Sequence, residues 1–484
     1  MVIAILAAGA PTLVEAQGGT RLLRQPGLSA NHVVFTYGAD VWIADRDGGD
    51  ARRLTSTPAV ESTPHFSPDG RGVAFSSNRS GSSAVYVVPA AGGMPTRLTW
   101  HPSAALHGRN WQVVRERYAP LVPHIRHRAD LTYILDQMNG EMSVGHSFVF
   151  GGDLPDVDRS SVGLLGADLM ADSGGWQIGR IYTSESWNPN LSAPLERPGL
   201  GVTEGEYLVG VDGMELSAGQ DPYELLDGTA GRQTTLHLNS TPSMGDARDV
   251  TVVPIRSENG LRQRAWVEDN RRRVDEMSGG KLAYIWVPNT GGGVFAFDRY
   301  FFAQQDKLGA VVDERFNGGG LLDDYIVDLM TRKVRAAITN EVPNGVPIRL
   351  PAGILGPKVL LINEYAGSGG DFFPWIFRQQ RAGLLIGKRT WGGLVKSSVH
   401  YALTDGGALT APDNAIFDPE EDVWVAENMG VPPDIEVGFD AKSAAAGGDP
   451  QLERAVHELL QQLEETPAIT PPQFPRPARK PGQR

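Results

Sequence analysis

Residues 363–371 read Asn-Glu-Tyr-Ala-Gly-Ser-Gly-Gly-Asp and lie between an apolar run, residues 359–362, and the pair Phe372-Phe373. This pattern is typical of a strand that passes through a tight turn into a helix. Glycines allow the sharp turn, expose the hydroxyl of Ser368, and leave the amide of Gly369 free to face a developing oxyanion. The stretch therefore indicates acyl-transfer chemistry. The alternative is a glycine-rich turn that holds a serine by chance.

Apolar, strand-like runs surround this turn and alternate with helical stretches. They occupy residues 282–287, 308–313, 359–362 and 384–387. Such runs are typical of a largely parallel sheet whose faces are covered by helices. One loop of this sheet carries three consecutive glycines, Gly318, Gly319 and Gly320, whose amides can bind a carbonyl oxygen or a peptide backbone. A plain flexible loop is the alternative.

The composition excludes several classes of protein. A chain of 484 residues with 41% hydrophobic residues can form several buried cores, which predicts a multidomain protein. Its net charge of -13 argues against a nucleic-acid partner, and no apolar run reaches the length of a membrane span. The chain has no cysteine, and its ten histidines contain no His-Glu-x-x-His motif. We therefore expect neither a metal nor another cofactor.

The N-terminal part contains a signal-like segment and a repeat. Residues 1–25 begin with a short apolar run typical of a secretory signal, although no basic residues precede it; a buried strand is the alternative. Within residues 26–104, Val-Trp-Ile-Ala-Asp at 41–45 and Arg-Leu-Thr at 53–55 recur as Val-Tyr-Val-Val-Pro at 85–89 and Arg-Leu-Thr at 97–99. The spacing of 44 residues is typical of propeller blades, but a closed propeller needs about four to eight blades. The segment predicts two blades of a partial β-propeller.

The next two segments differ in periodicity. Residues 105–160 place apolar side chains at three- and four-residue steps, which predicts a helical segment that leads to Gly-His-Ser-Phe at 145–148. A lone histidine after a helix is usually structural, so His146 needs support from elsewhere in the chain.

Residues 161–257 are typical of a compact β-rich module, and its turn at 205–213 resembles the matching turn of bacterial PDZ domains. Such modules add an extended peptide to a sheet edge, and an inert spacer is the alternative.

From about residue 107 to residue 464 the chain resembles tricorn protease and its homologues, a branch of the serine peptidases that also contains the C-terminal-processing proteases. The resemblance rests on residues 363–371, on Gly-Lys-Arg-Thr-Trp-Gly-Gly at 387–393 and on Glu-Asn-Met-Gly-Val-Pro-Pro-Asp at 427–434. It implies a multidomain α/β plus β fold with partial β-propeller blades, a helical segment, a PDZ-like β-module and an α/β serine peptidase core over residues 258–463. The proline-rich residues 464–484 are expected to be a disordered tail.

The same resemblance implies catalytic roles for residues from three segments. Ser368 matches the nucleophile, His146 the general base and Glu427 the carboxylate of the relay, while the amides of Gly369 and Gly318 would stabilise the oxyanion. A serine hydroxyl becomes a strong nucleophile only when a neutral imidazole takes its proton, and the imidazolium then needs a carboxylate. The order His, Ser, Glu along the chain differs from that of α/β-hydrolases, which argues against an esterase.

Two positions depart from the family pattern. Gly145 replaces a serine that bridges toward the glutamate in the archetype, so the link from His146 to Glu427 must be direct, water-mediated or made by another hydroxyl. Gly393 replaces the lysine base of the processing proteases, which favours the histidine mechanism. Lys396 lies nearby and keeps a serine-lysine dyad open as an alternative.

The predicted function is the hydrolysis of oligopeptides through an acyl-enzyme intermediate. The residues expected to flank the peptide and pair with its backbone are Gly318, Gly319, Gly320, Lys396, Ser397 and Ser398. A peptide-binding, catalytically weakened or inactive truncated homologue is the alternative, because Gly145 departs from the pattern and most of the propeller region is missing. The resemblance implies a homo-oligomer, with a hexamer among the options, and a cytoplasmic location. A true signal at the N-terminus would instead imply a periplasmic or secreted protein.

Overall fold

A computed structural model describes residues 24–57, 59–77, 79, 84–98, 110–157, 159–172, 174–185, 187–338, 348–425 and 427–465. The chain divides into two compact units, one with residues 1–154, 287–305 and 311–484, the other with residues 155–286 and 306–310. The signal-like segment predicted at 1–25 and the tail predicted at 464–484 lie outside the described residues, apart from the last two residues of the former and the first two of the latter.

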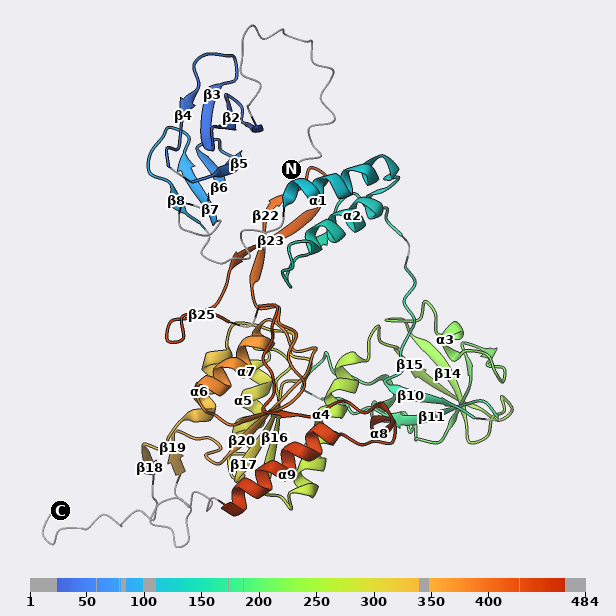
Figure 1. The fold of residues 1–484 in the computed structure, drawn as a ribbon. Helices are drawn as coiled ribbons and strands as arrows, with labels where there is room; N and C mark the ends of the chain where they lie inside the picture. Colours follow the sequence, from blue (N-terminus) through green and yellow to red (C-terminus); the bar gives the residue numbers. More distant parts are fainter. Residues whose placement is uncertain are drawn as a thin grey trace, which may run out of the picture. The chain divides into compact units, whose positions relative to one another are not determined.

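The first unit begins with two four-stranded antiparallel sheets (Figure 1). Their strands are β1 (Arg24–Leu28), β2 (His32–Tyr37), β3 (Asp40–Asp45) and β4 (Arg52–Arg53), then β5 (Glu61–Phe66), β6 (Gly72–Ser77), β7 (Ala84–Pro89) and β8 (Thr96–Arg97). Side chains from both sheets, among them Val34, Val41, Phe75 and Val88, share one buried cluster. Each sheet therefore covers a face of the other, and the two blades predicted from the repeat are confirmed.

A helical segment follows and ends at the loop that carries His146. It contains α1 (Trp111–Tyr118), the 3-10 helix η3 (Ala119–His124) and α2 (Arg128–Gly140). After the loop, β9 (Val149–Phe150) pairs with β23 (Ala408–Asn414), which also pairs with β22 (Lys396–Ala402). The guanidinium of Arg128 makes an ion pair with Asp405 between β22 and β23. The helical segment is thus attached to residues that lie far away in the sequence.

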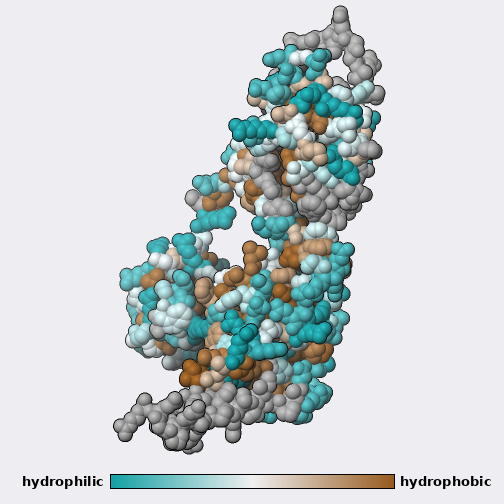
Figure 2. Space-filling view, turned by 90° about the vertical axis from the view of Figure 1, so that its left-hand side faces the viewer, coloured by the Kyte–Doolittle hydropathy of each residue, from teal (hydrophilic) through white to brown (hydrophobic). Residues whose placement is uncertain are grey.

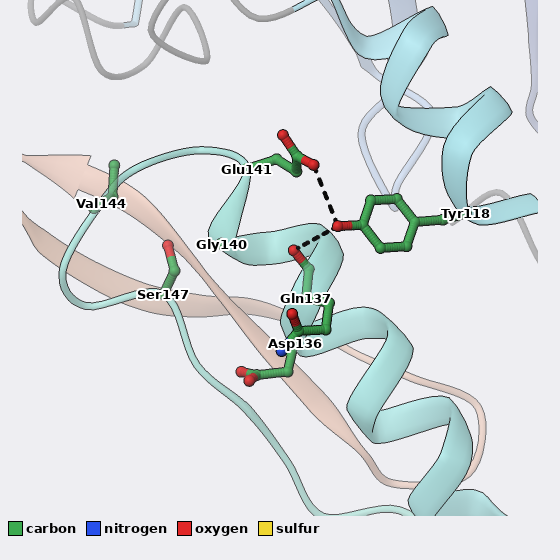
Figure 3. Close-up of a pocket in the computed structure, with 7 residues that line it drawn as sticks. All are labelled: Tyr118, Asp136, Gln137, Gly140, Glu141, Val144 and Ser147. Carbon is green, nitrogen blue, oxygen red and sulfur yellow. Dashed lines mark hydrogen bonds between the residues drawn. The ribbon is translucent and has the colours of Figure 1, made fainter.

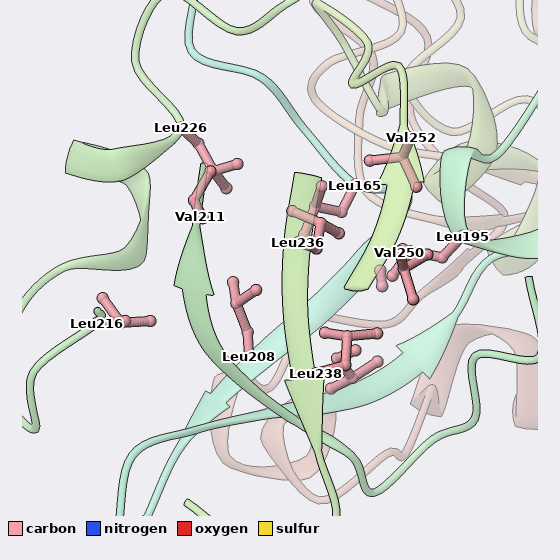
Figure 4. Close-up of a cluster of buried hydrophobic side chains, with 12 residues drawn as sticks. Leu165, Leu195, Leu208, Val211, Leu216, Leu226, Leu236, Leu238, Val250 and Val252 are labelled. Atoms are coloured by element: carbon pink, nitrogen blue, oxygen red, sulfur yellow. The ribbon is translucent and has the colours of Figure 1, made fainter. Parts of the chain in front are cut away.

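The second unit contains the β-rich module. Its six-stranded antiparallel sheet contains β10 (Ala167–Ala171), β11 (Trp176–Ile181), β12 (Tyr207–Val211), β13 (Met214–Glu215), β14 (Thr234–Asn239) and β15 (Arg248–Val252). Every second residue of β14 is buried, as expected for a strand with one face on the core. Leu208, Val211, Leu236 and Leu238 lie in this core (Figure 4). The module also includes η4 (Pro194–Glu196) and α3 (Pro222–Leu225).

The second unit continues past residue 257, where the sequence analysis placed the start of the peptidase core. Helix α4 (Asn259–Met277) and strand β16 (Leu282–Trp286) belong to it. The side chain of Asn270 donates to the hydroxyl of Tyr284 over 3.2 Å, which joins the helix to the strand.

The main sheet has the strand order β16, β17 (Gly309–Asp313), β20 (Lys358–Ile362), β21 (Leu384–Gly387) and β26 (Ile435–Glu436). The pairs β20–β21 and β21–β26 are parallel, and every residue of β17 and β20 is buried. Helices α5 (Val294–Ala303), α6 (Asp323–Thr331), α7 (Gly369–Gln379) and α9 (Pro450–Glu465) accompany this sheet (Figure 1). The predicted α/β core is confirmed, and its strands are apolar because both faces are covered.

Short elements complete the described structure. They are β18 (Ala336–Ile338), β19 (Ile348–Leu350), β24 (Phe417–Asp418), β25 (Val423–Trp424) and α8 (Ala441–Ala445). One face of the molecule is mainly hydrophilic with scattered hydrophobic patches (Figure 2). Within the described ranges, no helix combines the length and the apolar character that a membrane span requires.

Candidate active site

Ser368 stands at the junction of β20 and α7 in a backbone conformation that is rare for a residue with a side chain. Its φ is 61° and its ψ is -116°, and α7 begins at the next residue. Such a conformation costs free energy and persists only where the surroundings enforce it, which is common at functional sites. Ser368 thus occupies the position between strand and helix at which such turns hold a nucleophile.

The buried carboxylate of Asp371 holds this turn in place. It accepts hydrogen bonds from the amides of Ser368 at 3.0 Å, Gly392 at 2.7 Å and Gly393 at 3.0 Å, and from the hydroxyl of Thr390. The same carboxylate therefore connects the nucleophile turn to residues 390–393. No role was predicted for Asp371 from the sequence, although an acidic residue three positions after a helix-capping serine is a recognisable capping signal.

The glycine loop after β17 packs directly on the nucleophile. Gly319 has a φ of 88°, and a β-carbon added to it would lie 2.6 Å from the Cβ and 3.0 Å from the Oγ of Ser368. The amide of Gly369 has no hydrogen-bond acceptor in the part of the chain that the structure describes. By contrast, the amide of Gly318 donates to the carbonyl of Pro288 over 3.1 Å. Gly369 is thus free to face an oxyanion, whereas Gly318 must first release Pro288.

Asp323 begins α6 just after the glycine loop and is almost fully buried. Burial raises the pKa of this carboxyl to about 7. An unfolded aspartate loses its proton near pH 3.9, so between about pH 4 and pH 7 the native state binds more protons than the unfolded state. The stabilisation from Asp323 is complete below this window and is lost as the pH rises through it, by up to about 4 kcal/mol.

We expect Asp323→Asn to remove this loss of stability at higher pH. The free energy of unfolding, measured by urea titration at pH 5 and pH 8, should fall less between the two pH values in Asp323→Asn than in the wild type. Asp324→Asn is the matched control, because Asp324 lies in the same helical turn and is exposed. Equal pH dependence of the wild type and Asp323→Asn would contradict the assignment.

His146 lies in the loop between α2 and β9, close to the nucleophile turn. Its ring contacts that of Trp391 edge-on with centroids 5.7 Å apart, and Trp391 also packs against Gly367, where an added β-carbon would lie 2.5 Å from the indole. The hydroxyl of Thr410 donates to the His146 carbonyl over 2.7 Å. The Nδ1 atom of His146 is buried and has no hydrogen-bond partner among the described residues. Trp391 thus contacts both the predicted base and the turn of the predicted nucleophile.

Glu427 lies beside the residue that precedes His146. Its Oε1 accepts from the amide of Gly145 at 3.2 Å, and its Oε2 accepts from the amides of Leu394 at 2.8 Å and Val395 at 2.6 Å. Within the described residues, His146 makes no hydrogen bond to Glu427 or to Ser368. The three predicted catalytic residues therefore share one neighbourhood, and their hydrogen-bonded relay is not formed in this structure.

Comparisons with known proteins agree with this architecture. Family models match the chain in order as the tricorn protease N-terminal beta propeller domain at residues 20–117, the tricorn protease C1 domain at 100–140, the tricorn protease PDZ domain at 163–257 and peptidase family S41 at 281–437. The chain is 36% identical over 378 residues to tricorn protease homolog 1 of Streptomyces coelicolor, which covers 77% of this chain and 35% of that protein. The chain is a tricorn protease homologue.

Two further comparisons point the same way. The tricorn protease of Thermoplasma acidophilum is 34% identical over 352 residues, which are 72% of this chain and 32% of that protein. A crystal structure of the tricorn protease matches with a TM-score of 0.66 and 26% identity, over 91% of this chain and 46% of that one. The chain thus spans about a third of the length of the Streptomyces coelicolor and Thermoplasma acidophilum proteins. The predicted family resemblance is confirmed.

The residue before the predicted base of this tricorn protease homologue, Gly145, has no room for a side chain. A β-carbon added to Gly145 would lie 2.7 Å from the Cα of Gly393 and 2.9 Å from the ring of Trp391. The backbone of Gly393 and the indole ring of Trp391 thus occupy the space that a serine side chain would need. The contact to Glu427 comes instead from the amide of Gly145.

We therefore expect Gly145→Ser to weaken the homologue, although the family resemblance implies a serine at this position. The added side chain should push residues 391–393 away from Asp371, lowering the free energy of unfolding by about 1–3 kcal/mol and reducing any peptide turnover. Chemical denaturation and a peptide assay measure both. Gly140→Ala is the control, because an added β-carbon there meets no atom within 4 Å. Turnover that rises in Gly145→Ser would contradict this steric argument.

The predicted peptide-flanking residues Lys396, Ser397 and Ser398 lie at the start of β22. Among the described strands, β22 pairs only with β23, so its other edge is open to an added strand. Lys396 is exposed and makes no hydrogen bond to Ser368 within the described ranges. A serine-lysine dyad needs a lysine that is desolvated, so the exposure of Lys396 disfavours that alternative.

A hollow of about 440 Å³ lies behind the His146 loop and is separate from the nucleophile turn. It is lined by Tyr118, Asp136, Gln137, Gly140, Glu141, Val144 and Ser147 (Figure 3). The hydroxyl of Tyr118 lies 3.1 Å from the carbonyl of Gln137 and 3.2 Å from Oε1 of Glu141. None of the predicted catalytic residues lines this hollow, so the candidate site stays at Ser368. Within the described residues no group of three or more potential metal ligands occurs.

Proposed function

We propose that this tricorn protease homologue is a serine peptidase that hydrolyses oligopeptides with Ser368 as the nucleophile, His146 as the general base and Glu427 as the carboxylate of the relay. The observation that carries the proposal is the strained turn of Ser368, which is followed by the free amide of Gly369 and packed against Gly319. A turn of this kind exposes a hydroxyl and provides an oxyanion donor at the same place.

The reaction proceeds in two halves. A ring nitrogen of His146 takes the hydroxyl proton as Oγ of Ser368 bonds to the peptide carbonyl, and the amide of Gly369 stabilises the oxyanion. The imidazolium then gives its proton to the leaving amine, and the acyl-enzyme remains. A water molecule, deprotonated by His146, attacks the ester and releases the acid, which restores the hydroxyl of Ser368.

Glu427 stabilises the imidazolium through a link that avoids position 145. Its carboxylate is already oriented by three backbone amides. The hydroxyls of Ser147 and Ser397 are buried and have no hydrogen-bond partner among the described residues. Either of these hydroxyls, or a water molecule, is a candidate to complete the connection to His146.

Two sheet edges that can pair with an extended peptide support oligopeptides as the substrate class. The free edge of β22 offers backbone groups to an extended peptide, and backbone pairing gives affinity without a strong side-chain preference. The PDZ-type module is a second place where an extended peptide can add to a sheet edge. We extend the proposal to a homo-oligomer, with a hexamer as the family option, on resemblance to tricorn proteases.

A fluorophosphonate probe tests the proposal directly, because it reacts only with an activated serine hydroxyl. We expect labelling of the wild type and none of Ser368→Ala, while Ser443→Ala on α8 labels like the wild type. The second candidate is a peptide-binding homologue that does not cut, and the missing hydrogen bond between His146 and Ser368 favours it. A folded wild type that binds oligopeptides without labelling or turnover would support that candidate.

A further inference from the structure

The glycine loop and the nucleophile turn are joined by one residue, Asn317. Its backbone carbonyl accepts from the amide of Gly367 at 3.1 Å, in the turn that carries Ser368. Its side-chain Oδ1 accepts from the amide of Gly319 at 2.8 Å, in the glycine loop. Gly370 also packs against it, since a β-carbon added there would lie 2.9 Å from the carbonyl oxygen of Asn317. Asn317 thus sets how far Gly319 lies from Ser368.

Asn317 is itself held by a glutamate beneath the loop. Its Nδ2 donates to Oε2 of Glu314 over 2.9 Å, and its amide donates to the Glu314 carbonyl over 2.8 Å. Both side chains are completely buried. Because the amide group of Asn317 uses its oxygen for Gly319 and its nitrogen for Glu314, its orientation is fixed. Loss of the Glu314 contact would leave the amide free to rotate.

Glu314 is surrounded by acidic groups from several elements. Asp313 lies on β17, Asp323 on α6 and Asp371 on α7. Burial, with a further contribution from these carboxylates, raises the pKa of Glu314 well above its ordinary value, although the hydrogen bond from Asn317 opposes the shift. Burial of this carboxyl group thus favours its neutral form. A glutamine, which is neutral and has the same shape, can replace it in this contact.

We propose that Glu314 and Asn317 are positioning residues that hold the glycine loop against Ser368 at the spacing that oxyanion stabilisation requires. This inference rests on the proposed peptidase function. An oxyanion site acts on the transition state more than on the bound substrate, so its misplacement lowers kcat and leaves KM nearly unchanged. Neither residue contacts the substrate in this account.

The experiment compares Asn317→Ala, Glu314→Ala and Glu314→Gln with the wild-type chain on a fluorogenic oligopeptide. We expect kcat to fall about 10- to 100-fold in Asn317→Ala and Glu314→Ala, with KM within about twofold, and Glu314→Gln to regain most of the activity. Asn270→Ala is the matched control, because it also loses a buried amide contact but lies on α4. Its kcat should equal that of the wild type.

Amide hydrogen exchange gives a second readout that does not depend on turnover. The amides of Gly319 and Gly367 both donate to Asn317, so they should be protected in the wild type and should exchange faster in Asn317→Ala and Glu314→Ala. Wild-type kcat in Asn317→Ala, or Glu314→Gln as impaired as Glu314→Ala, would overturn the proposal. If Asn317→Ala does not fold, the comparison of the two Glu314 variants decides.

A failure of the proposed function can be told apart from a failure of this inference. A wild type without turnover refutes the peptidase, and the exchange of Gly319 and Gly367 then decides the positioning role alone. Unchanged exchange in all variants of Asn317 and Glu314 overturns the inference whatever the activity of the wild type.

Discussion

Alanine in place of His146 should lower kcat for oligopeptide hydrolysis by at least about a thousandfold, because His146 is the proposed acceptor of the hydroxyl proton of Ser368. KM should change much less, since the imidazole acts on the reaction and not on substrate binding. Fluorogenic peptide kinetics at neutral pH measure both constants. His457→Ala is the control, because His457 is exposed on α9 and belongs to no part of the site.

The result also separates the two candidate bases. Activity that survives in His146→Ala and disappears in Lys396→Ala would replace the histidine mechanism by the serine-lysine dyad. If Glu427 acts through His146, then Glu427→Gln should lower kcat in the wild type and have little further effect in His146→Ala, because residues that act as a unit are not additive.

Gly319→Ala should damage both turnover and stability, although it adds a single methyl group. The added carbon would lie 2.6 Å from Cβ of Ser368, and the φ of 88° already disfavours any residue other than glycine. The loop must move away from the nucleophile, so we expect kcat to fall by about a hundredfold or more, together with a loss of about 1–3 kcal/mol in the free energy of unfolding.

Gly318→Ala is the matched control for stability. It lies next to Gly319 in the sequence, and its φ is outside the left-handed region that favours glycine. A β-carbon added there would meet no atom within 4 Å. Its free energy of unfolding should therefore match that of the wild type. Equal urea midpoints for Gly319→Ala and the wild type, with unchanged turnover, would show that the loop does not press on Ser368 in solution.

The local part of the site could be predicted from the sequence, because its signals are short-range. A few neighbouring residues are enough to indicate the strand-to-helix turn at Ser368 and the following amide of Gly369. The same is true of the three-glycine loop. The two blades and the PDZ-type module could be predicted for the same reason, since turns and strand periodicity are local. The family signatures added the assignment of His146 and Glu427, which stays a prediction.

The rest of the site depends on contacts between distant segments, which no local pattern encodes. The role of Asp371 is clear only when residues 390–393 are seen to donate to it. The hydrogen bond from the amide of Gly318 to the carbonyl of Pro288 could not be predicted, since an amide in a glycine loop can equally face a ligand. The pair Glu314 and Asn317 is a further example, because a buried glutamate is indistinguishable in sequence from an exposed one.

The contact between Gly145 and Glu427 has a consequence for the biosynthesis of the protein. In the loop that carries His146, the carbonyl of His146 accepts a hydrogen bond from Thr410, and the amide of Gly145 donates one to Glu427. Both partners lie far later in the chain than the loop. A ribosome therefore makes the histidine long before it makes the groups that hold it. Under the proposed function, a nascent chain remains inert toward peptides until the segment with Thr410 and Glu427 has been made and has folded.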